Sequence, residues 1–476
     1  MKILNIINNK NFIDGQWISS VNKIAVTNPS TNQVIGYAPD LPQEEITRAI
    51  DAASRSFKHW SQTNFAQRIA ILKKWQQLIN DNINELADIL TLEQGKTLKD
   101  AKSEIMYGVS FVEWFVDVLN NVQGSIKSGI NKNHKIITEY EPVGPVAAIT
   151  PWNFPCAMVT RKVTPAIAAG CTVVLKPSEF TPFSALILAK LATDAGLPDG
   201  VLNIVTGDAE LIGKVLCADF RIRKLSFTGS TRVGKILYQN CHETLKRLSL
   251  ELGGNAPFIV FADCNVDKVI EDLLTVKLRS SGQSCTSPNR VFIHKDIYEI
   301  FKQKFAFKFS TLKSGDGFDD DSDVGPLINK AAIDKIISLI QDAVTKGAKI
   351  LCGGKANENF MEPTIIADCQ DNMAIFSNEI FGPVVALYQF DNEEEVINRA
   401  NATEYGLQAY LYSKDLSRAH KLTAALDFGM VSINSTSPFN CKATFAGRKA
   451  SGFGVEGGDE GIFEYLNTKY INLNIV

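Results

Sequence analysis

The sequence predicts an α/β protein built on a parallel, Rossmann-like sheet. From Pro142 onwards, short apolar runs of the buried-strand type alternate with helical runs. A second alternating set begins near Pro257 and continues to about Asn434. Alternation of strand and helix is the pattern of βαβ units, which place neighbouring strands parallel to one another.

The first 125 residues are expected to be mostly helical after a short β-like start. Pro42 precedes a helix-like run from Glu44 to Trp60. Apolar residues recur at helical spacing from Phe65 to Leu92, and a third amphipathic run covers Ala101 to Val122. Such spacing places the apolar side chains on one face of a helix.

The first alternating set supplies the predicted Rossmann-like sheet. Its strand-like runs are VAAIT (146–150), TVVLK (172–176), LNIVT (202–206), KLSFT (224–228) and LSLEL (248–252). The helical runs between them include Phe183–Ala195, Ala209–Cys217 and Arg232–Cys241. The second set contains the strand-like runs FIVFAD, RVFIH, PVVALYQF, LQAYLYS and MVSIN.

Two strand-like segments belong to neither set. Lys135–Glu141 alternates between apolar and polar residues, and Thr468–Ile475 has a similar character. Lone exposed strands are unstable and prone to aggregation unless they pair. We expect both to extend a sheet edge, including an edge in a second copy of the chain.

Composition excludes several classes of partner. The 476 residues are 45% apolar and 21% charged, with a net charge of −3, which gives no electrostatic reason to expect nucleic acid or an anionic membrane. No apolar run approaches the roughly 18 residues of a membrane span. The start of the chain turns polar too soon for a signal peptide.

The cysteines and histidines argue against disulfides and metal. The nine cysteines are odd in number and form no CxxC, and the five histidines are scattered without an HExxH. We therefore expect a reduced cytoplasmic protein with neither structural disulfides nor a metal centre.

Two glycine patterns point to functions that we reject. Gly229 to Lys235 resembles a phosphate-binding P-loop, but Ile236 stands where the loop needs a Ser or Thr for Mg²⁺. The loop still follows a strand and opens a helix, so its N–H groups can face phosphate. Gly452 to Gly457 spells GxGxxG, but no strand-like run leads into it and few residues follow. We interpret it as a flexible turn.

Cys285 is the predicted nucleophile. It lies in the polar, Gly-containing stretch 280–286, between a helix-like run (266–278) and a strand-like run (290–294). Reactive cysteines need an open, polar setting because the thiolate is the attacking species and apolar burial suppresses it.

Polar side chains at the ends of predicted strands accompany this cysteine. Asn153 follows the predicted strand 146–150. Lys176 ends the predicted strand 172–176, and Glu179 follows it. Glu251 lies at the end of the predicted strand 248–252. Ligands bind beyond the carboxyl ends of strands in open α/β sheets. A desolvated Glu251 could act as a general base, and the Asn153 amide could donate to an oxyanion. Each position taken alone has a structural alternative. The Asn153 motif could be a packed turn, Lys176 and Glu179 could be solvated charges, and Glu251 could be a capping or salt-bridged residue.

Together these motifs resemble the aldehyde dehydrogenase family over essentially the whole chain. The motifs are PWNFP (151–155), KPSE (176–179), FTGST (227–231), ELGGN (251–255), GQSC (282–285), EIFGPV (379–384) and SGFGVEGG (451–458). The resemblance implies a Rossmann-like NAD-binding domain (1–124 and 143–250), an α/β catalytic domain (251–445) and a small β oligomerisation element (125–142 and 446–476). It also implies a homodimer or homotetramer.

The resemblance assigns the catalytic roles. It implies that Cys285 attacks an aldehyde, that Asn153 and the Cys285 backbone N–H hold the oxyanion, and that Glu251 activates water to hydrolyse the thioester. Relatives that transfer the acyl group to CoA do not need this base, so Glu251 favours a free acid as product. A CoA-acylating enzyme and a catalytically silent protein on the same scaffold are the rejected alternatives.

The resemblance also implies an NAD site. Glu379 is assigned to the nicotinamide ribose, Lys176 and Glu179 to the adenosine ribose, and Gly229 and Ser230 to the pyrophosphate. A carboxylate such as Glu179 repels a 2′-phosphate, which favours NAD, with NADP as the alternative. The remaining implied cofactor residues are Trp152, Ser178 and Leu252.

Two arginines narrow the choice of aldehyde substrate. Arg161 and Arg279 stand at positions where relatives acting on plain aldehydes usually carry aromatic residues, and two guanidinium groups can grip a distal carboxylate. This pattern is similar to the succinate-semialdehyde dehydrogenases. Glutarate semialdehyde, one methylene longer, would be disfavoured by only about 1–3 kcal/mol and stays open.

Departures in one loop leave a broader range of aldehydes as a further alternative. Phe439 replaces a family Ser that helps bind the substrate carboxylate, and Thr444–Gly447 departs from Pro-Phe-Gly-Gly. The second cysteine that relatives carry after the nucleophile is Ser287 here.

Overall fold

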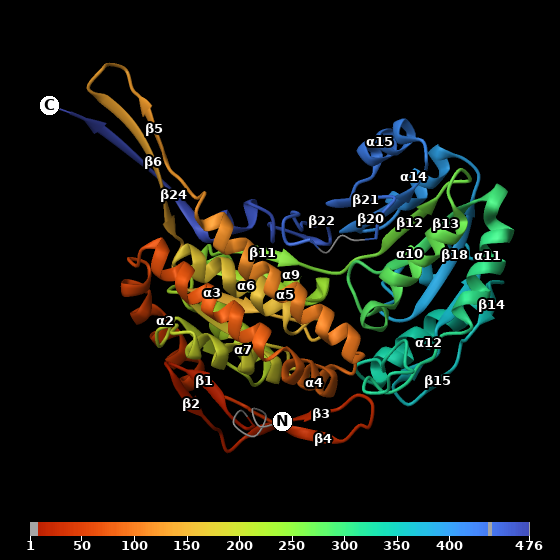
Figure 1. The fold of residues 1–476 in the computed structure, drawn as a ribbon, viewed down its shortest axis with the longest axis horizontal. Coiled ribbons are helices and arrows are strands. Elements are labelled where there is room, and N and C mark those ends of the chain that lie inside the picture. The colour runs from red at the N-terminus through yellow and green to blue at the C-terminus, as the bar shows by residue number, and fades with distance from the viewer. Residues whose placement is uncertain (1–7, 437–439, 476) are drawn as a thin grey trace.

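The computed structural model describes residues 8–436 and 440–475. The chain forms two large α/β halves, each around its own sheet, and a three-stranded arm that projects from the first half (Figure 1). This arrangement confirms the predicted α/β class. No helix in the described ranges has the length and apolar character that crossing a membrane would require.

The sheet of the first half has eight strands. Its central strands β9, β8, β7, β10 and β11 run parallel, as predicted, and antiparallel strands flank them at both edges. In spatial order the strands are β2 (Gln16–Ile18), β1 (Asn11–Ile13), β9 (Leu202–Ile204), β8 (Val173–Lys176), β7 (Val146–Ile149), β10 (Lys224–Thr228), β11 (Arg247–Glu251) and β23 (Gly452–Phe453).

Helices cover both faces of this sheet. They are α2 (Gln43–Trp60), α3 (Phe65–Asp81), α4 (Ile83–Gln94), α5 (Leu98–Leu119), α6 (Ala157–Ala169), α7 (Phe183–Asp194), α8 (Ala209–Ala218) and α9 (Thr231–Asn240). The helical spacing from Phe65 to Leu92 predicted one run, whereas the structure has two helices that meet at Asn82. The Asn82 side chain donates to the Leu78 carbonyl (2.8 Å) and so competes with the regular helical hydrogen bonds.

The second half repeats the pattern with a seven-stranded sheet. Its strands are β14 (Lys349–Cys352), β17 (Thr364–Ala367), β18 (Val384–Phe390), β13 (Pro288–His294), β12 (Ala256–Val260), β20 (Gln408–Tyr412) and β21 (Met430–Ile433), all parallel except β14. Its helices are α10 (Val266–Leu278), α11 (Lys295–Phe309), α12 (Lys330–Thr345), α13 (Ala374–Ser377), α14 (Glu393–Asn401) and α15 (Leu416–Ala425).

Apolar side chains enter a core on each face of these parallel strands. In β7, Val146 and Ala148 pack into one core, whereas Ala147 and Ile149 pack into another. In β12, Phe258 and Ile259 likewise face opposite cores. Strands that are buried on both faces have continuous apolar sequences, and for this reason the sequence predicts them.

The arm corrects the expectation that its strands lack partners within the chain. β6 (His134–Pro142) lies between β5 (Ser125–Ser128) and β24 (Leu466–Asn474). It pairs with β24 antiparallel along its whole length, so segments from distant parts of the sequence satisfy each other's hydrogen bonds. Figure 1 shows the three strands extending away from the helical layer.

The GxGxxG segment is not a flexible turn. Gly452 pairs with Glu251, so β23 forms the edge of the first sheet next to β11. Gly452 has a φ of 100°, and a Cβ there would lie 1.9 Å from the Leu250 carbonyl oxygen, so only glycine fits. Glu456 in the same segment is buried beside the helix that carries Arg161.

Two hairpins, one further strand pair and three short helices complete the described elements. The hairpins are β3 (Lys23–Thr27) with β4 (Val34–Pro39) and β15 (Ala356–Asn357) with β16 (Phe360–Met361). The further pair is β19 (Tyr405–Gly406) with β22 (Arg448–Lys449), which are far apart in the sequence. The 3₁₀ helices are η1 (His242–Thr244), η2 (Arg279–Gly282) and η3 (Glu460–Tyr465).

Candidate active site

The loop before Cys285 has an unusual backbone. After α10 ends at Leu278, Ser280 and Ser281 adopt positive φ angles of 49° and 57°, and Gly282 follows at 73°. Residues other than glycine adopt such a backbone conformation only where contacts with the surrounding structure stabilise it. Here the Ser280 N–H donates to the Asp100 carboxylate (2.8 Å), and the Ser281 hydroxyl donates to a carbonyl oxygen (2.9 Å).

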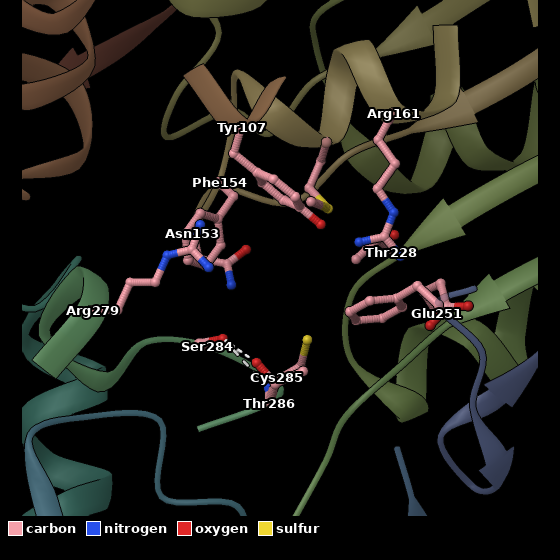
Figure 2. A pocket seen from close by; sticks show the side chains of 12 residues that line it. Tyr107, Asn153, Phe154, Arg161, Thr228, Glu251, Arg279, Ser284, Cys285 and Thr286 are labelled. Carbon is pink, nitrogen blue, oxygen red and sulfur yellow. Dashed lines mark hydrogen bonds between the residues drawn. The ribbon is translucent and has the colours of Figure 1, made fainter. Parts of the chain in front are cut away.

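Cys285 lines a cavity and is half-buried, so its surroundings are less open than the sequence predicted. In Figure 2 its sulfur points into the space between Asn153 and Glu251. Burial raises the pKa of its thiol to about 12, and Glu379 and Glu251 add to this, whereas Arg161 opposes it. Side chains from other segments line this cavity, and the composition of the loop alone does not predict how closely they approach.

Glu251 ends β11 and faces the same cavity. Its exposure is 2%, and neither carboxylate oxygen has a hydrogen-bond partner among the described residues. Burial raises its pKa well above the usual value, as does the neighbouring Glu456, while Arg161 and Lys162 oppose the rise. A carboxyl group in this environment holds a proton readily, as a general base must.

Gly254, three residues after Glu251, allows the chain beyond β11 to approach the nucleophile loop. A Cβ on Gly254 would lie 2.1 Å from the Cys285 carbonyl oxygen. The two backbones therefore touch only because this position has no side chain. The contact brings the end of the first sheet against the nucleophile loop of the second half.

Asn153 lies in the turn between β7 and α6 and is buried. Its Nδ2 donates to the Gln283 carbonyl oxygen (2.9 Å), two residues before Cys285. A side-chain amide has two N–H bonds. One holds the nucleophile loop, and the other can serve an oxygen atom in the cavity.

Both predicted arginines line this cavity, and Figure 2 shows them on different sides of it. Arg161 in α6 is 2% exposed, with Nε 2.7 Å from Glu456 Oε2 and its guanidinium 3.7 Å from the Phe445 ring centroid. Its Nη2 has no hydrogen-bond partner in the described ranges. Arg279 stacks over Phe154 at 4.8 Å.

Several lining residues were not predicted. They come from α5, the start of α6 and the turn before it, the end of β10, the nucleophile loop and the C-terminal segment, namely Tyr107, Phe154, Met158, Thr228, Ser284, Thr286 and Phe445. Tyr107 lies within a long amphipathic helix, where nothing in the sequence distinguishes it from a core residue. Phe439, which the sequence placed in the substrate loop, lies outside the described residues.

A second cleft adjoins the first, and Asn153, Thr228 and Cys285 line both. Five of the predicted cofactor residues line it, namely Trp152, Gly229, Ser230, Leu252 and Glu379. Ile328, Asn329, Ala332, Lys335 and Phe381 line it without having been predicted.

The polar groups of this cleft suit a phosphorylated ligand with ribose hydroxyls. Gly229 and Ser230 precede α9, and the Ser230 hydroxyl accepts from the Val233 N–H (3.3 Å). A helix start presents N–H groups that attract phosphate. Glu379 accepts from the Gly254 N–H (3.0 Å), and burial raises its pKa to about 7.

The remaining predicted cofactor residues lie at the end of β8, outside the lining of this cleft. Lys176 and Glu179 form an ion pair (2.9 Å), and the Ser178 hydroxyl accepts from the Phe180 N–H (3.3 Å). Although burial raises the pKa of Glu179, Lys176 outweighs it, and the carboxyl stays below its usual pKa. Since β8 neighbours β7, these groups are at the same sheet edge as Asn153.

Comparisons with known proteins identify the family. The model of the aldehyde dehydrogenase family matches residues 17–471. The chain is 46% identical over 466 residues to a succinate semialdehyde dehydrogenase of Acinetobacter baylyi, covering 97% of this chain and 96% of the relative. It is 45% identical over 467 residues to a glutarate-semialdehyde dehydrogenase of Pseudomonas putida, covering 98% and 97%.

A solved structure shows the same fold. The crystal structure of succinate-semialdehyde dehydrogenase from Burkholderia pseudomallei superimposes with a TM-score of 0.97 at 44% identity, and 99% of each chain is covered. The family model, the sequence relatives and the solved structure all agree on the family. The chain therefore belongs to the aldehyde dehydrogenase family.

Proposed function

We propose that this protein oxidises succinate semialdehyde to succinate with NAD. The observation that carries the proposal is the position of Cys285, which lines the cavity with Glu251 and Arg161 as well as the adjoining cleft with Glu379. A nucleophile at this junction can hold an aldehyde between an activating base and a cofactor.

The chain's own residues support the covalent steps. Cys285 attacks the carbonyl carbon as a thiolate after its proton passes to water; a C–S bond forms, the C=O π bond breaks, and the oxygen gains negative charge. The free N–H bond of the Asn153 amide and the Cys285 backbone N–H donate to that oxygen. The chemistry that NAD supplies when bound is acceptance of the hydride that leaves the carbonyl carbon, which converts the adduct to a thioester.

Glu251 completes the cycle. It takes a proton from water, the water oxygen attacks the thioester carbon, and the C–S bond breaks to release succinate and the Cys285 thiolate. Because Glu251 serves hydrolysis, its buried position in the cavity favours water over CoA as the acyl acceptor.

NAD fits the cleft beside Cys285. Gly229 and Ser230 would hold the pyrophosphate, and Glu379 the nicotinamide ribose. Lys176 and Glu179 would hold the adenosine ribose, and the negative charge of Glu179 favours NAD over NADP, which remains the alternative.

Arg161 and Arg279 support a substrate with a distal carboxylate. Arg161 keeps one buried amino group, Nη2, without a hydrogen-bond partner among residues 8–436 and 440–475, while Phe445 stacks on its guanidinium. A buried donor that is left unpaired destabilises the folded protein, and a ligand that accepts a hydrogen bond from it removes this cost. Glutarate semialdehyde, the substrate in the name of the Pseudomonas putida relative, is the second candidate.

We further propose that the protein is a cytoplasmic homodimer or homotetramer. The projecting arm exposes apolar side chains, among them Ile126, Tyr470 and Leu473, as an association surface would. All nine cysteines are unpaired, which fits a reducing compartment.

The test is NADH absorbance after the purified protein is mixed with NAD⁺ and, separately, succinate semialdehyde, glutarate semialdehyde or butanal. We expect kcat/KM to be at least tenfold higher, as an order of magnitude, for the semialdehydes than for butanal, because each charge-assisted hydrogen bond contributes about 1.5–3 kcal/mol. Equal or better turnover of butanal would refute the carboxylate site, and a strict need for CoA would refute hydrolysis.

A further inference from the structure

A buried ion pair lies behind the Asn153 turn and outside both cavities. Lys96, just after α4, and Glu104 in α5 bring Nζ and Oε2 to 2.5 Å. Their side chains are 1% and 0% exposed. Removing two charges from water is costly, so such a pair needs further hydrogen bonds to be tolerated.

Those further hydrogen bonds go to the Asn153 segment. Lys96 Nζ donates to the Asn153 carbonyl oxygen (2.7 Å) and lies 4.3 Å from the centroid of the Phe154 ring. Glu104 Oε1 accepts from the backbone N–H groups of Cys156 (2.8 Å) and Ala157 (3.1 Å). The pair therefore holds the segment on both sides of Phe154.

Glu104 also supplies what the start of α6 lacks. The N-cap residue Cys156 makes no side-chain capping bond, so the first N–H groups of α6 need another acceptor. A carboxylate at a helix N-terminus satisfies these donors and interacts well with the helix dipole. The same helix carries Arg161 into the cavity.

We infer that Lys96 and Glu104 are positioning residues for Asn153 in aldehyde oxidation. The Asn153 amide is anchored at its Nδ2 by the Gln283 carbonyl, and its backbone is anchored by Lys96. With both ends fixed, the free N–H of the amide has one direction. Oxyanion donors act only when they are pre-organised, and a displacement of about 1 Å can lower a rate by about 100-fold.

This inference rests on the proposed function, and a double-mutant cycle tests it. The variants are Lys96→Met, Asn153→Ala and the double variant, and the readout is kcat/KM for succinate semialdehyde at saturating NAD⁺. We expect Lys96→Met to lower kcat/KM by about 10- to 100-fold. It should leave the KM for NAD⁺ near the wild-type value, and the double variant should be no slower than Asn153→Ala alone.

Lys224→Met is the matched control. Lys224 is also fully buried and pairs with a glutamate, Glu464 (3.1 Å), and its side chain contacts Ser249 and Tyr465. It lies beside Val146 at the start of β7, at the opposite end of that strand from the Asn153 turn. It reports what loss of a buried lysine does to stability, measured by thermal unfolding. A purely structural Lys96 would behave like this control, with additive losses in the double variant.

Glu104→Gln decides the question if Lys96→Met does not fold, because glutamine keeps an acceptor for the α6 amides. Its combination with Asn153→Ala should again be non-additive. Wild-type kcat/KM in a folded Lys96→Met, or full additivity in the cycle, would overturn the inference. Failure of the wild-type protein to oxidise any of the aldehydes would instead overturn the proposed function.

Discussion

Arg161 interacts with protein on one side and faces the cavity on the other. Its Nε lies 2.7 Å from Glu456, which also pairs with Lys162, while Nη2 has no partner in the described part of the chain. Loss of Arg161 would therefore leave Glu456 with Lys162 as its remaining cation. Arg161 can therefore be replaced to test substrate selection without leaving the buried Glu456 carboxylate unpaired.

We predict that Arg161→Met lowers kcat/KM for succinate semialdehyde by about 10- to 100-fold, the equivalent of one or two charge-assisted hydrogen bonds. Butanal has no carboxylate, so its kcat/KM should change far less. Steady-state NADH formation with both aldehydes measures the ratio. An equal loss for both substrates would mean that Arg161 is structural.

Glu251 should set the acid limb of the pH profile. Because burial raises its pKa, the folded protein keeps this carboxyl protonated to a higher pH than an exposed Glu. A general base acts in its unprotonated form, so hydrolysis should be slow at low pH and rise as pH passes through the raised pKa. We therefore expect the midpoint of this limb to lie well above 4.5, the ordinary Glu value.

The rapid-mixing experiment for Glu251 follows from its role. Glu251→Gln should still form NADH once per active site and then stall, because the thioester is not hydrolysed. A burst of about one NADH per subunit without steady turnover would support this. Loss of the burst itself would place Glu251 in an earlier step.

At the scale of elements, the arm is a separate three-stranded sheet that projects from the first half. β5 and β24 are its two edges, and Ile126 on β5 is 71% exposed. Open edges with apolar side chains favour association with another copy. The pairing of β6 with β24 makes the arm a stable unit that can present such a surface.

We predict that Ile126→Glu lowers the particle mass measured by light scattering toward that of a monomer. Phe307→Glu on α11 is the control, since Phe307 is similarly exposed at 74% but lies far from the arm. A stable, active monomer in the wild-type protein would contradict the proposed homo-oligomer, as would an unchanged mass in Ile126→Glu.

At the scale of the whole molecule, the cofactor cleft joins the two halves. Gly229 and Ser230 come from the first half, whereas Glu379 and Lys335 come from the second. A ligand held by both halves binds the native arrangement and has no comparable site in the unfolded chain. Cofactor binding should therefore stabilise the molecule as one unit.

We predict that NAD⁺ raises the thermal unfolding temperature and that the shift grows with concentration. At 100 times its Kd, the expected stabilisation is about 2.7 kcal/mol. Glu379→Gln keeps an acceptor for Gly254 but should need more NAD⁺ for the same shift. Calorimetry with and without NAD⁺ provides the measurement, and the absence of any shift would count against a dinucleotide in this cleft.

Much of the fold could be predicted because local pattern and burial agree. The buried runs at 146–150, 172–176 and 224–228 became β7, β8 and β10 with nearly the same limits. The break at Asn82 and the strand at Gly452 were missed, since one depends on a side-chain hydrogen bond and the other on an edge supplied by β11. The division into domains remains a prediction.

The sequence by itself determined the family and singled out Cys285, Asn153 and Glu251 as the predicted catalytic residues, because reactive residue types follow strands or occupy loops in a recognisable order. Only the tertiary structure decided their environment. The raised pKa of the Cys285 thiol and the ion pair of Arg161 with Glu456 come from segments far apart in the chain. Burial and electrostatic neighbours depend on which segments pack together, and that information is spread over the whole chain rather than written in any one motif.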